Sequence, residues 1–295
     1  MSNFTILGGP PSERTDDSNE RADDRSADGD SSTPLPSGDP ETATARGRLY
    51  SLLALGFDRP NDEFEAALAD GSYVDGIVES AATVDGAVGR TAEAVGAAAA
   101  ESTERELGRQ WASLFGVEEG RSVSPYELTY LPGPLLTTVR QLADIRGFYD
   151  AFGLEVGEAM PYRGDHVCYL TEFLGHCCLR EARLRRRGDD GGVAIVVDAR
   201  GSFLEDHLGR WFWRFADEVS AHDDGFYAAL ADLLAALVEN ELETLALEPE
   251  WVPDAPAVTE WSEDVFGDAG RGCGGCGSDA DGSNRSLSSD NVSLE

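Results

Sequence analysis

Apolar residues recur along most of the chain at the three- and four-residue spacing of a single helix face. Residues 42–56 carry Leu49, Leu52 and Leu53 on one such face, and Pro60 follows as a stop signal. The same spacing predicts helices over residues 61–70, 85–100, 103–115, 138–152, from 165 to the arginines ending at 187, from 202 past 219, and 225–245. Three of these helices begin with a Ser or Thr followed three residues later by Glu or Gln, which predicts capping boxes at Thr103, Thr138 and Ser202.

Only residues 193–197, Val-Ala-Ile-Val-Val, resemble a strand, and one strand has no partner to pair with. The predicted class is therefore all-α: a helical bundle of two lobes joined by a hinge. We expect a disordered acidic extension over 1–41, an N-terminal helical lobe over 42–153, a hinge over 154–164, a C-terminal helical lobe over 165–258, and a disordered Gly/Ser/Asp-rich tail over 259–295.

The formal net charge is −33, and every one of the 23 basic residues is Arg. The acidic residues are spread along the whole chain, which favours a surface adapted to concentrated salt over a single acidic face for a basic partner. In near-molar salt the Debye length is only about 3 Å, so apolar burial has to supply most of the binding energy. Nucleic-acid binding is not expected, because the chain has no basic face to displace counterions.

Residues 1–10 lack the basic start and the long apolar run of a signal peptide, and no stretch approaches the ~20 apolar residues that span a bilayer. We therefore expect a cytoplasmic protein. Its five cysteines, an odd number, do not indicate a disulfide framework.

The residues between positions 111 and 130 are the first candidates for function. Trp111, Leu114 and Phe115 share one helix face, and spacing alone favours simple core packing there. Tyr126 and Tyr130 follow in a Pro/Gly-rich loop that is expected to lie at the surface. Tyr and Trp offer large contact areas with few rotamers to freeze, so these rings, with Glu127 beside them, predict a groove for a peptide.

Asp165 and His166 open a predicted helix. The simple interpretation is that Asp165 is an N-cap, worth about 1 kcal/mol, which leaves His166 unexplained. The functional interpretation is that this pair grips the polar end of a bound peptide or senses protonation. His207, next to Leu208 and four residues before Trp211, is expected to be a structural histidine.

Cys273 and Cys276 have the spacing of metal or redox sites, but zinc normally needs four ligands and no second pair lies nearby. They are weak candidates, as are the buried-looking Cys177 and Cys178 beside His176. No motif for a catalytic nucleophile, a nucleotide or any other cofactor occurs. We therefore expect a protein that binds another protein and is not an enzyme.

Taken in order, these residues resemble the TorD/DmsD-like, NarJ-related chaperones that mature molybdenum-containing redox enzymes. The resemblance spans roughly residues 42–245. It rests on Trp111-x-x-Leu114-Phe115-Gly116, the loop from Ser124 to Tyr130, Asp165-His166, the Ala143–Leu154 run, His207-Leu208-x-x-Trp211 and Gly225-Phe226-Tyr227. The two terminal extensions lie outside the family pattern.

The resemblance implies two helical lobes and binding of the twin-arginine signal peptide of a molybdopterin oxidoreductase precursor, which is held until its cofactor is inserted. It implies that Trp111, Leu114, Phe115, Asp165 and His166 contact the peptide. Three alternatives stay open: a nitrate-reductase-type assembly chaperone for a client that is not exported, a metal or redox-switch protein that uses the Cys and His residues, and a regulatory adaptor. Either a monomer or a domain-swapped dimer is expected.

Overall fold

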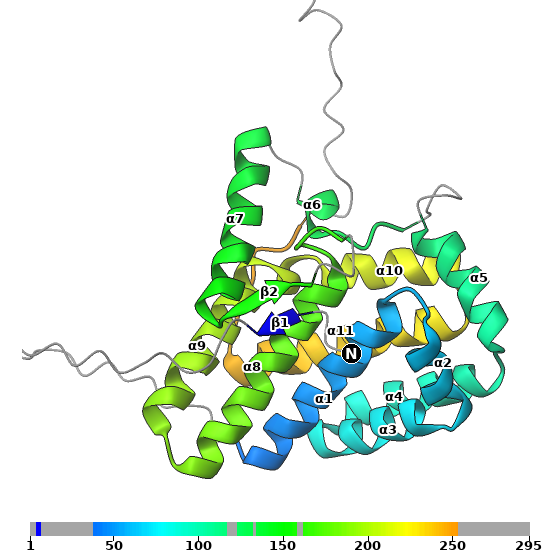
Figure 1. Ribbon diagram of the computed structural model, residues 1–295, viewed down its shortest axis with the longest axis horizontal. Coiled ribbons are helices and arrows are strands. Elements are labelled where there is room, and N and C mark those ends of the chain that lie inside the picture. Colours follow the sequence, from blue (N-terminus) through cyan, green and yellow to red (C-terminus); the bar gives the residue numbers. More distant parts are fainter. Residues whose placement is uncertain (1–3, 7–37, 117–122, 132–133, 158–161, 253–295) are drawn as a thin grey trace, which may run out of the picture. The chain divides into compact units, whose positions relative to one another are not determined.

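The computed structural model describes residues 4–6, 38–116, 123–131, 134–157 and 162–252, which are helical apart from one pair of short strands (Figure 1). The helices are α1 (Pro40–Phe57), α2 (Asp62–Ala69), α3 (Ser72–Val84), α4 (Gly86–Ala100), α5 (Glu104–Phe115), α6 (Glu127–Tyr130), α7 (Leu135–Ala151), α8 (Val167–Arg187), α9 (Asp190–Asp206), the 3₁₀ turn η1 (Leu208–Arg210), α10 (Phe212–His222) and α11 (Phe226–Leu245). The strands are β1 (Phe4–Ile6) and β2 (Leu154–Val156). The all-α prediction is confirmed.

Several helices begin where short polar side chains satisfy the free N–H groups of the first turn. Asp39, Asn61 and Asp85 cap α1, α2 and α4. The capping box of α5 is present in full: Thr103 accepts from the Glu106 N–H while the Glu106 carboxylate accepts from the Thr103 N–H at 3.0 Å. Local sequence therefore determines these starts.

Three predicted boundaries are wrong. Residues 193–197 lie in α9, where Val193, Val196 and Val197 are buried at helical spacing, so packing overrides the strand preference of β-branched residues. No capping box forms at Ser202, because α9 continues to Asp206. α7 starts at Leu135, directly after Pro134, and not at Thr138. No element was expected for residues 72–84, which form α3.

The core centres on the contact between α1 and α8. A Cβ atom added to Gly47 of α1 would lie 2.7 Å from the Leu179 side chain, and one added to Gly175 of α8 would lie 3.1 Å from the Gly47 carbonyl oxygen. Only glycine permits this approach of the two backbones. None of the helices in the described part of the chain is both long and apolar enough to cross a membrane.

Contacts between the described helices cross the expected hinge. α1 packs against α8 and α4 packs against α11, and each pair joins residues from both sides of the expected hinge. Residues 4–6 and 38–252 accordingly belong to one compact unit. The expected hinge, residues 154–164, contains β2, and residues 158–161 lie outside the described residues. The division into two lobes stays a prediction.

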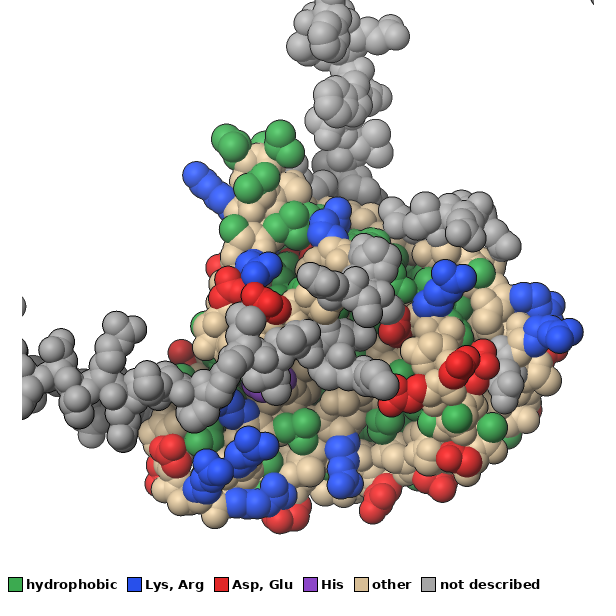
Figure 2. Space-filling view, viewed as in Figure 1, with side chains coloured by type: hydrophobic (Ala, Val, Ile, Leu, Met, Phe, Trp, Pro, Cys, Tyr) green, Lys and Arg blue, Asp and Glu red, His purple; other side chains and the backbone are tan. Residues whose placement is uncertain are grey.

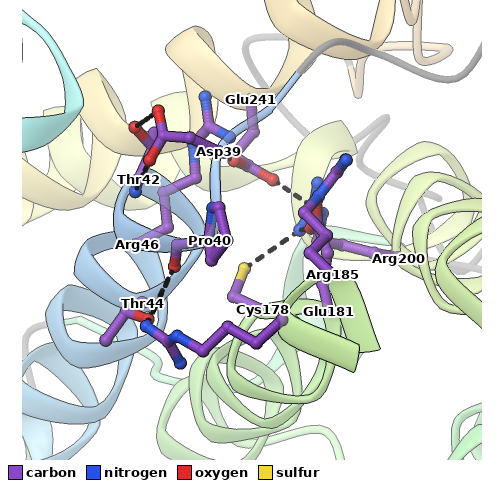
Figure 3. A network of polar contacts seen from close by, with 11 residues as sticks. Asp39, Pro40, Thr42, Thr44, Arg46, Cys178, Glu181, Arg185, Arg200 and Glu241 are labelled. Carbon is purple, nitrogen blue, oxygen red and sulfur yellow. Dashed lines mark hydrogen bonds and ion pairs between the residues drawn. The ribbon is translucent and has the colours of Figure 1, made fainter. Parts of the chain in front are cut away.

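A buried network of charges joins four helices near this contact (Figure 3). Glu241 of α11 pairs with Arg46 of α1 at 2.7 Å and with Arg200 of α9 at 2.9 Å. Arg200 also pairs with Glu181 of α8, which in turn binds Arg185 at 2.7 Å. Burial alone would raise the pKa of Glu181, but the two guanidinium groups more than offset it and lower that pKa. An intact buried ion pair of this kind adds little net stability, but removing one partner is costly because it leaves a buried charge uncompensated.

Removing one member of this network should destabilise the fold. Arg200→Leu leaves the carboxylates of Glu181 and Glu241 buried without their shared guanidinium, which is expected to lower the free energy of unfolding by about 3–5 kcal/mol. Urea denaturation measures the change. The matched control is Arg183→Leu at an exposed position of α8, for which a change within about 0.5 kcal/mol is expected. Equal effects of the two substitutions would contradict the structural role of the network.

Candidate functional site

The predicted apolar face of α5 lies in the core. Trp111 is 8% exposed, and its Nε1 donates to the Phe57 carbonyl oxygen at 2.9 Å. Leu114 and Phe115 are buried as well, and the Phe115 ring packs against the Phe215 ring at 6.1 Å between centroids. These side chains therefore do not line an open groove in the structure. A direct contact with a peptide stays a prediction that would require them to become accessible.

The short helix α6 presents Glu127 to the interior. Its fully buried carboxylate lies 2.8 Å from Nδ1 of His207 and accepts from Nε1 of Trp211 at 3.2 Å. The ring of Tyr130 stacks on that of Trp211, with centroids 4.8 Å apart. Burial, followed by the charge of Glu218 2.9 Å from its hydroxyl, raises the pKa of Tyr130. Glu127 and Tyr130 are thus structural residues in the state described.

His207 connects the break between α9 and η1 to this cluster. Its Nε2 lies 3.3 Å from a carboxylate oxygen of Asp144 on α7, a residue whose side chain is 59% exposed. Burial alone would lower the pKa of His207, but its hydrogen bond to Glu127 and the charges of Glu127, Asp144 and Asp206 raise it above the ordinary value. The structure agrees with the expected structural role, although a contact 80 residues apart leaves no local signal in the sequence.

Asp165 and His166 have roles different from those expected: the cap of α8 is His166 and not Asp165. His166 caps α8: its Nδ1 accepts from the Cys168 N–H at 3.2 Å. The buried carboxylate of Asp165 instead accepts from the Leu128 N–H at 3.1 Å and from Nη2 of Arg163 at 2.7 Å. The prediction of an Asp165 N-cap is wrong, because this carboxylate bonds to a loop 37 residues earlier.

Main-chain bonds join the same two segments. The Glu127 N–H donates to the Asp165 carbonyl oxygen at 3.0 Å, and the Val167 N–H donates to that of Pro125 at 2.8 Å. His166 lies between two rings: it stacks on Tyr162 at 4.1 Å and meets Tyr126 edge-on at 4.9 Å. Tyr126 is half-buried, and it is the most exposed of the predicted ring residues. Together these contacts hold the 123–131 segment against the start of α8.

The cysteines form no metal site that the structure describes. Cys168, Cys177 and Cys178 are buried free thiols, and burial raises the pKa of Cys178 to about 12. Among the residues whose placement is described, no three His, Cys, Asp or Glu side chains gather as a metal ion needs. Cys273 and Cys276 lie outside the described residues.

The surface feature that sequence reasoning missed is on α7. Leu135, Leu136 and Val139 are 78%, 74% and 55% exposed, and Figure 2 shows apolar side chains gathered over the free end of this helix. Leu135, Val139 and Leu142 share a face at helical spacing, so the exposed residues continue towards the middle of the helix. We call this face the α7 stripe. The recurrence of Leu, Val and Ile at helical spacing after Pro134 was the sequence signal from which this apolar face could have been predicted.

The α7 stripe leads into a pocket of about 260 Å³ between α7 and β2. Its apolar lining comes from Leu142, Ile145 and Tyr149 of α7 and from Val156 of β2. Tyr149 is fixed by its hydroxyl, which donates to the Gly164 carbonyl oxygen at 2.8 Å.

Two arginines complete the pocket wall, and each is already paired. Nε of Arg146 donates to Asp150 at 2.8 Å, and Arg163 is bound to Asp165. The wall therefore offers apolar surface and no unpaired acid, base or nucleophile. Such a hollow suits the binding of apolar side chains.

The charge of His207 makes a prediction about pH. Because its folded-state pKa is raised, the charged ring stabilises the fold fully below the unfolded-state value of about 6.5, and this contribution is lost as the pH rises through the higher folded-state pKa. His207→Gln should therefore lower the free energy of unfolding more at about pH 6 than at about pH 8.5. Urea denaturation at both pH values checks this. The exposed His222→Gln is the control, and a loss independent of pH would contradict the assignment.

Comparison with known proteins gives a consistent result. The family model described as "Nitrate reductase delta subunit" matches residues 80–217, a span that includes α7, β2 and the whole pocket. The chain is 30% identical over 147 residues to the chaperone protein TorD of Shewanella sp. strain ANA-3, covering 48% of this chain and 63% of that protein. It is 24% identical over 132 residues to TorD of Vibrio parahaemolyticus, covering 44% and 60%.

The match thus spans less than two thirds of the length of these relatives. They are named as chaperones and not as enzymes, in agreement with the missing catalytic motifs. The chain is thus similar, over residues 80–217, to the nitrate reductase delta subunits and, over about half of its length, to the TorD chaperones.

Proposed function

We propose that this protein is a cytoplasmic chaperone that binds the N-terminal leader of a molybdopterin-containing reductase, of the DMSO or TMAO reductase type, and assists cofactor insertion before export. The observation that carries the proposal is the exposed α7 stripe that runs into the apolar pocket. Relatives named as chaperones support the class of function, and the resemblance described above supplies the class of client.

The chemistry of a leader fits the site. A signal peptide contains an apolar stretch, and an apolar helix face beside a pocket is one of the recurring ways in which proteins bind such segments. Burying one Leu or Val side chain contributes about 1.5–3 kcal/mol. This term does not weaken in concentrated salt, which suits a chain with a net charge of −33.

The paired arginines of a twin-arginine leader need exposed acceptors. Glu127 and Asp165 are buried and already bonded, so they do not serve without rearrangement. Asp144 and Asp150 of α7 pair with His207 and Arg146, but their side chains are more than half exposed and so are accessible to a further guanidinium. We therefore assign the arginine contacts to α7, and give Asp165 and His166 the role of positioning the Tyr126 loop beside it.

The second candidate is a nitrate-reductase-type assembly chaperone whose client is not exported. The description of the matching family model, nitrate reductase delta subunit, favours it. The same stripe and pocket would serve, but without a requirement for paired arginines.

Acidic residues in the α7 stripe should weaken leader binding. Leu135→Asp with Val139→Asp places charge where apolar side chains would be buried, and we expect the leader's affinity to fall by more than about tenfold. Titration calorimetry in concentrated KCl measures it. The matched control is Ile195→Asp, at a 70% exposed apolar position of α9, which should leave the affinity unchanged. Saturable binding that the double variant retains would exclude the stripe as the site.

The two kinds of client are separated by the leader itself. For an exported client, replacing both leader arginines by glutamine should weaken binding to the parent protein, because charge-assisted bonds to carboxylates are lost. The loss should shrink in an Asp144→Asn and Asp150→Asn double variant. Equal affinity for both leaders would instead support the nitrate-reductase-type function.

A further inference from the structure

The only sheet within the described residues is formed by segments from distant parts of the chain. β1 pairs antiparallel with β2 in the register Phe4 with Val156, Thr5 with Glu155 and Ile6 with Leu154. β2 belongs to the connection between α7 and α8, whereas β1 lies near the start of the chain (dark blue in Figure 1). Residues 4–6 thus lie alongside the strand that carries Val156, which forms part of the pocket wall.

This pairing is short enough to be exchangeable. Two strands of three residues form no independently stable sheet, since a two-stranded ribbon is marginal in water. β2, in contrast, is anchored, because it packs on α7 and its Leu154 is buried in the core. Without β1, the N–H and C=O groups along one edge of β2 would be unpaired, and such an edge accepts an extended segment of another chain.

We propose that the edge of β2 is a docking strand for an extended client segment, and that Phe4–Ile6 occupies it in cis as a built-in competitor. The proposal rests on the proposed function, which supplies the client. Main-chain bonds to β2 would hold any extended peptide, and selection would come from side chains that reach the pocket and the α7 stripe. A client leader then binds by displacing β1.

The covalent connection decides how strongly β1 competes. β1 and α1 belong to the same chain, so the docking of β1 is an intramolecular step with which a free client segment has to compete. A segment that is docked ten times as often as it is free lowers the apparent affinity of a competitor about tenfold. A short strand that is docked on β2 ten times as often as it is free therefore suffices to regulate client binding.

Proline substitution removes the competitor without touching the helices. Proline has no N–H to donate to a strand partner. The variant Phe4→Pro, Thr5→Pro and Ile6→Pro loses every donor of β1, whichever residues bond to β2. We expect it to bind the leader peptide about tenfold more tightly than the parent does, measured by calorimetry. A chain lacking residues 2–9 should behave in the same way.

The matched control carries the same number of prolines beyond the strand: Ser12→Pro, Ser18→Pro and Ser26→Pro. It should bind the leader as the parent does. If the parent binds the leader but the strand-broken variant binds it no more tightly, the competition is refuted while the proposed function stands. If no variant binds any leader, the proposed function is refuted.

Docking of the segment itself has a readout that needs no client. Hydrogen exchange at the amides of residues 154–156 should be faster in the strand-broken variant than in the parent. Adding a synthetic peptide of residues 1–8 should restore protection. Equal exchange in parent and variant, with no effect of the peptide, would overturn the assignment of β2 as a docking strand.

Discussion

The fold depends on how closely α1 and α8 approach. Gly47 and Gly175 let the two backbones touch, and any side chain at either position would collide with the opposite helix. Because the helices are that near, Arg46 of α1 and Glu181 of α8 reach the same buried charge network, and α9 and α11 join it through Arg200 and Glu241. The glycine contact sets the spacing, and the charges set the order of the helices around it.

A second layer of constraints fixes the surface that we assign to client binding. Asp165 and Glu127 bind main-chain and side-chain groups that sequence places far apart, and His207 links Glu127 to Asp144 on α7. The contact between His207 and the partly exposed Asp144 helps to fix α7, although the first turns of this helix have little apolar cover. The helix can keep Leu135 and Val139 exposed because its other end is held by the core around Ile145 and Tyr149.

Sequence reasoning succeeded where the cause was local. The caps at Asn61 and Thr103 bond within three residues, so their starts could be read directly. It failed where partners are remote: Asp165 looks like a cap until its bond to Leu128 is known, and 193–197 looks like a strand until its burial within α9 is seen. Trp111 is a similar case, since periodicity defines a face but does not say whether that face is covered. The exposed α7 stripe was missed because helical spacing alone does not show that a face stays uncovered.

The two buried histidines of the site need opposite protonation states. His166 caps α8 through a lone pair on Nδ1, which an imidazolium does not have. His207, between carboxylates, is stabilised as the cation. Loss of the His207 proton at high pH would weaken the link from α9 through α6 to α7. The two rings therefore fasten the site by different means: one caps a helix through a lone pair, and the other carries positive charge between carboxylates.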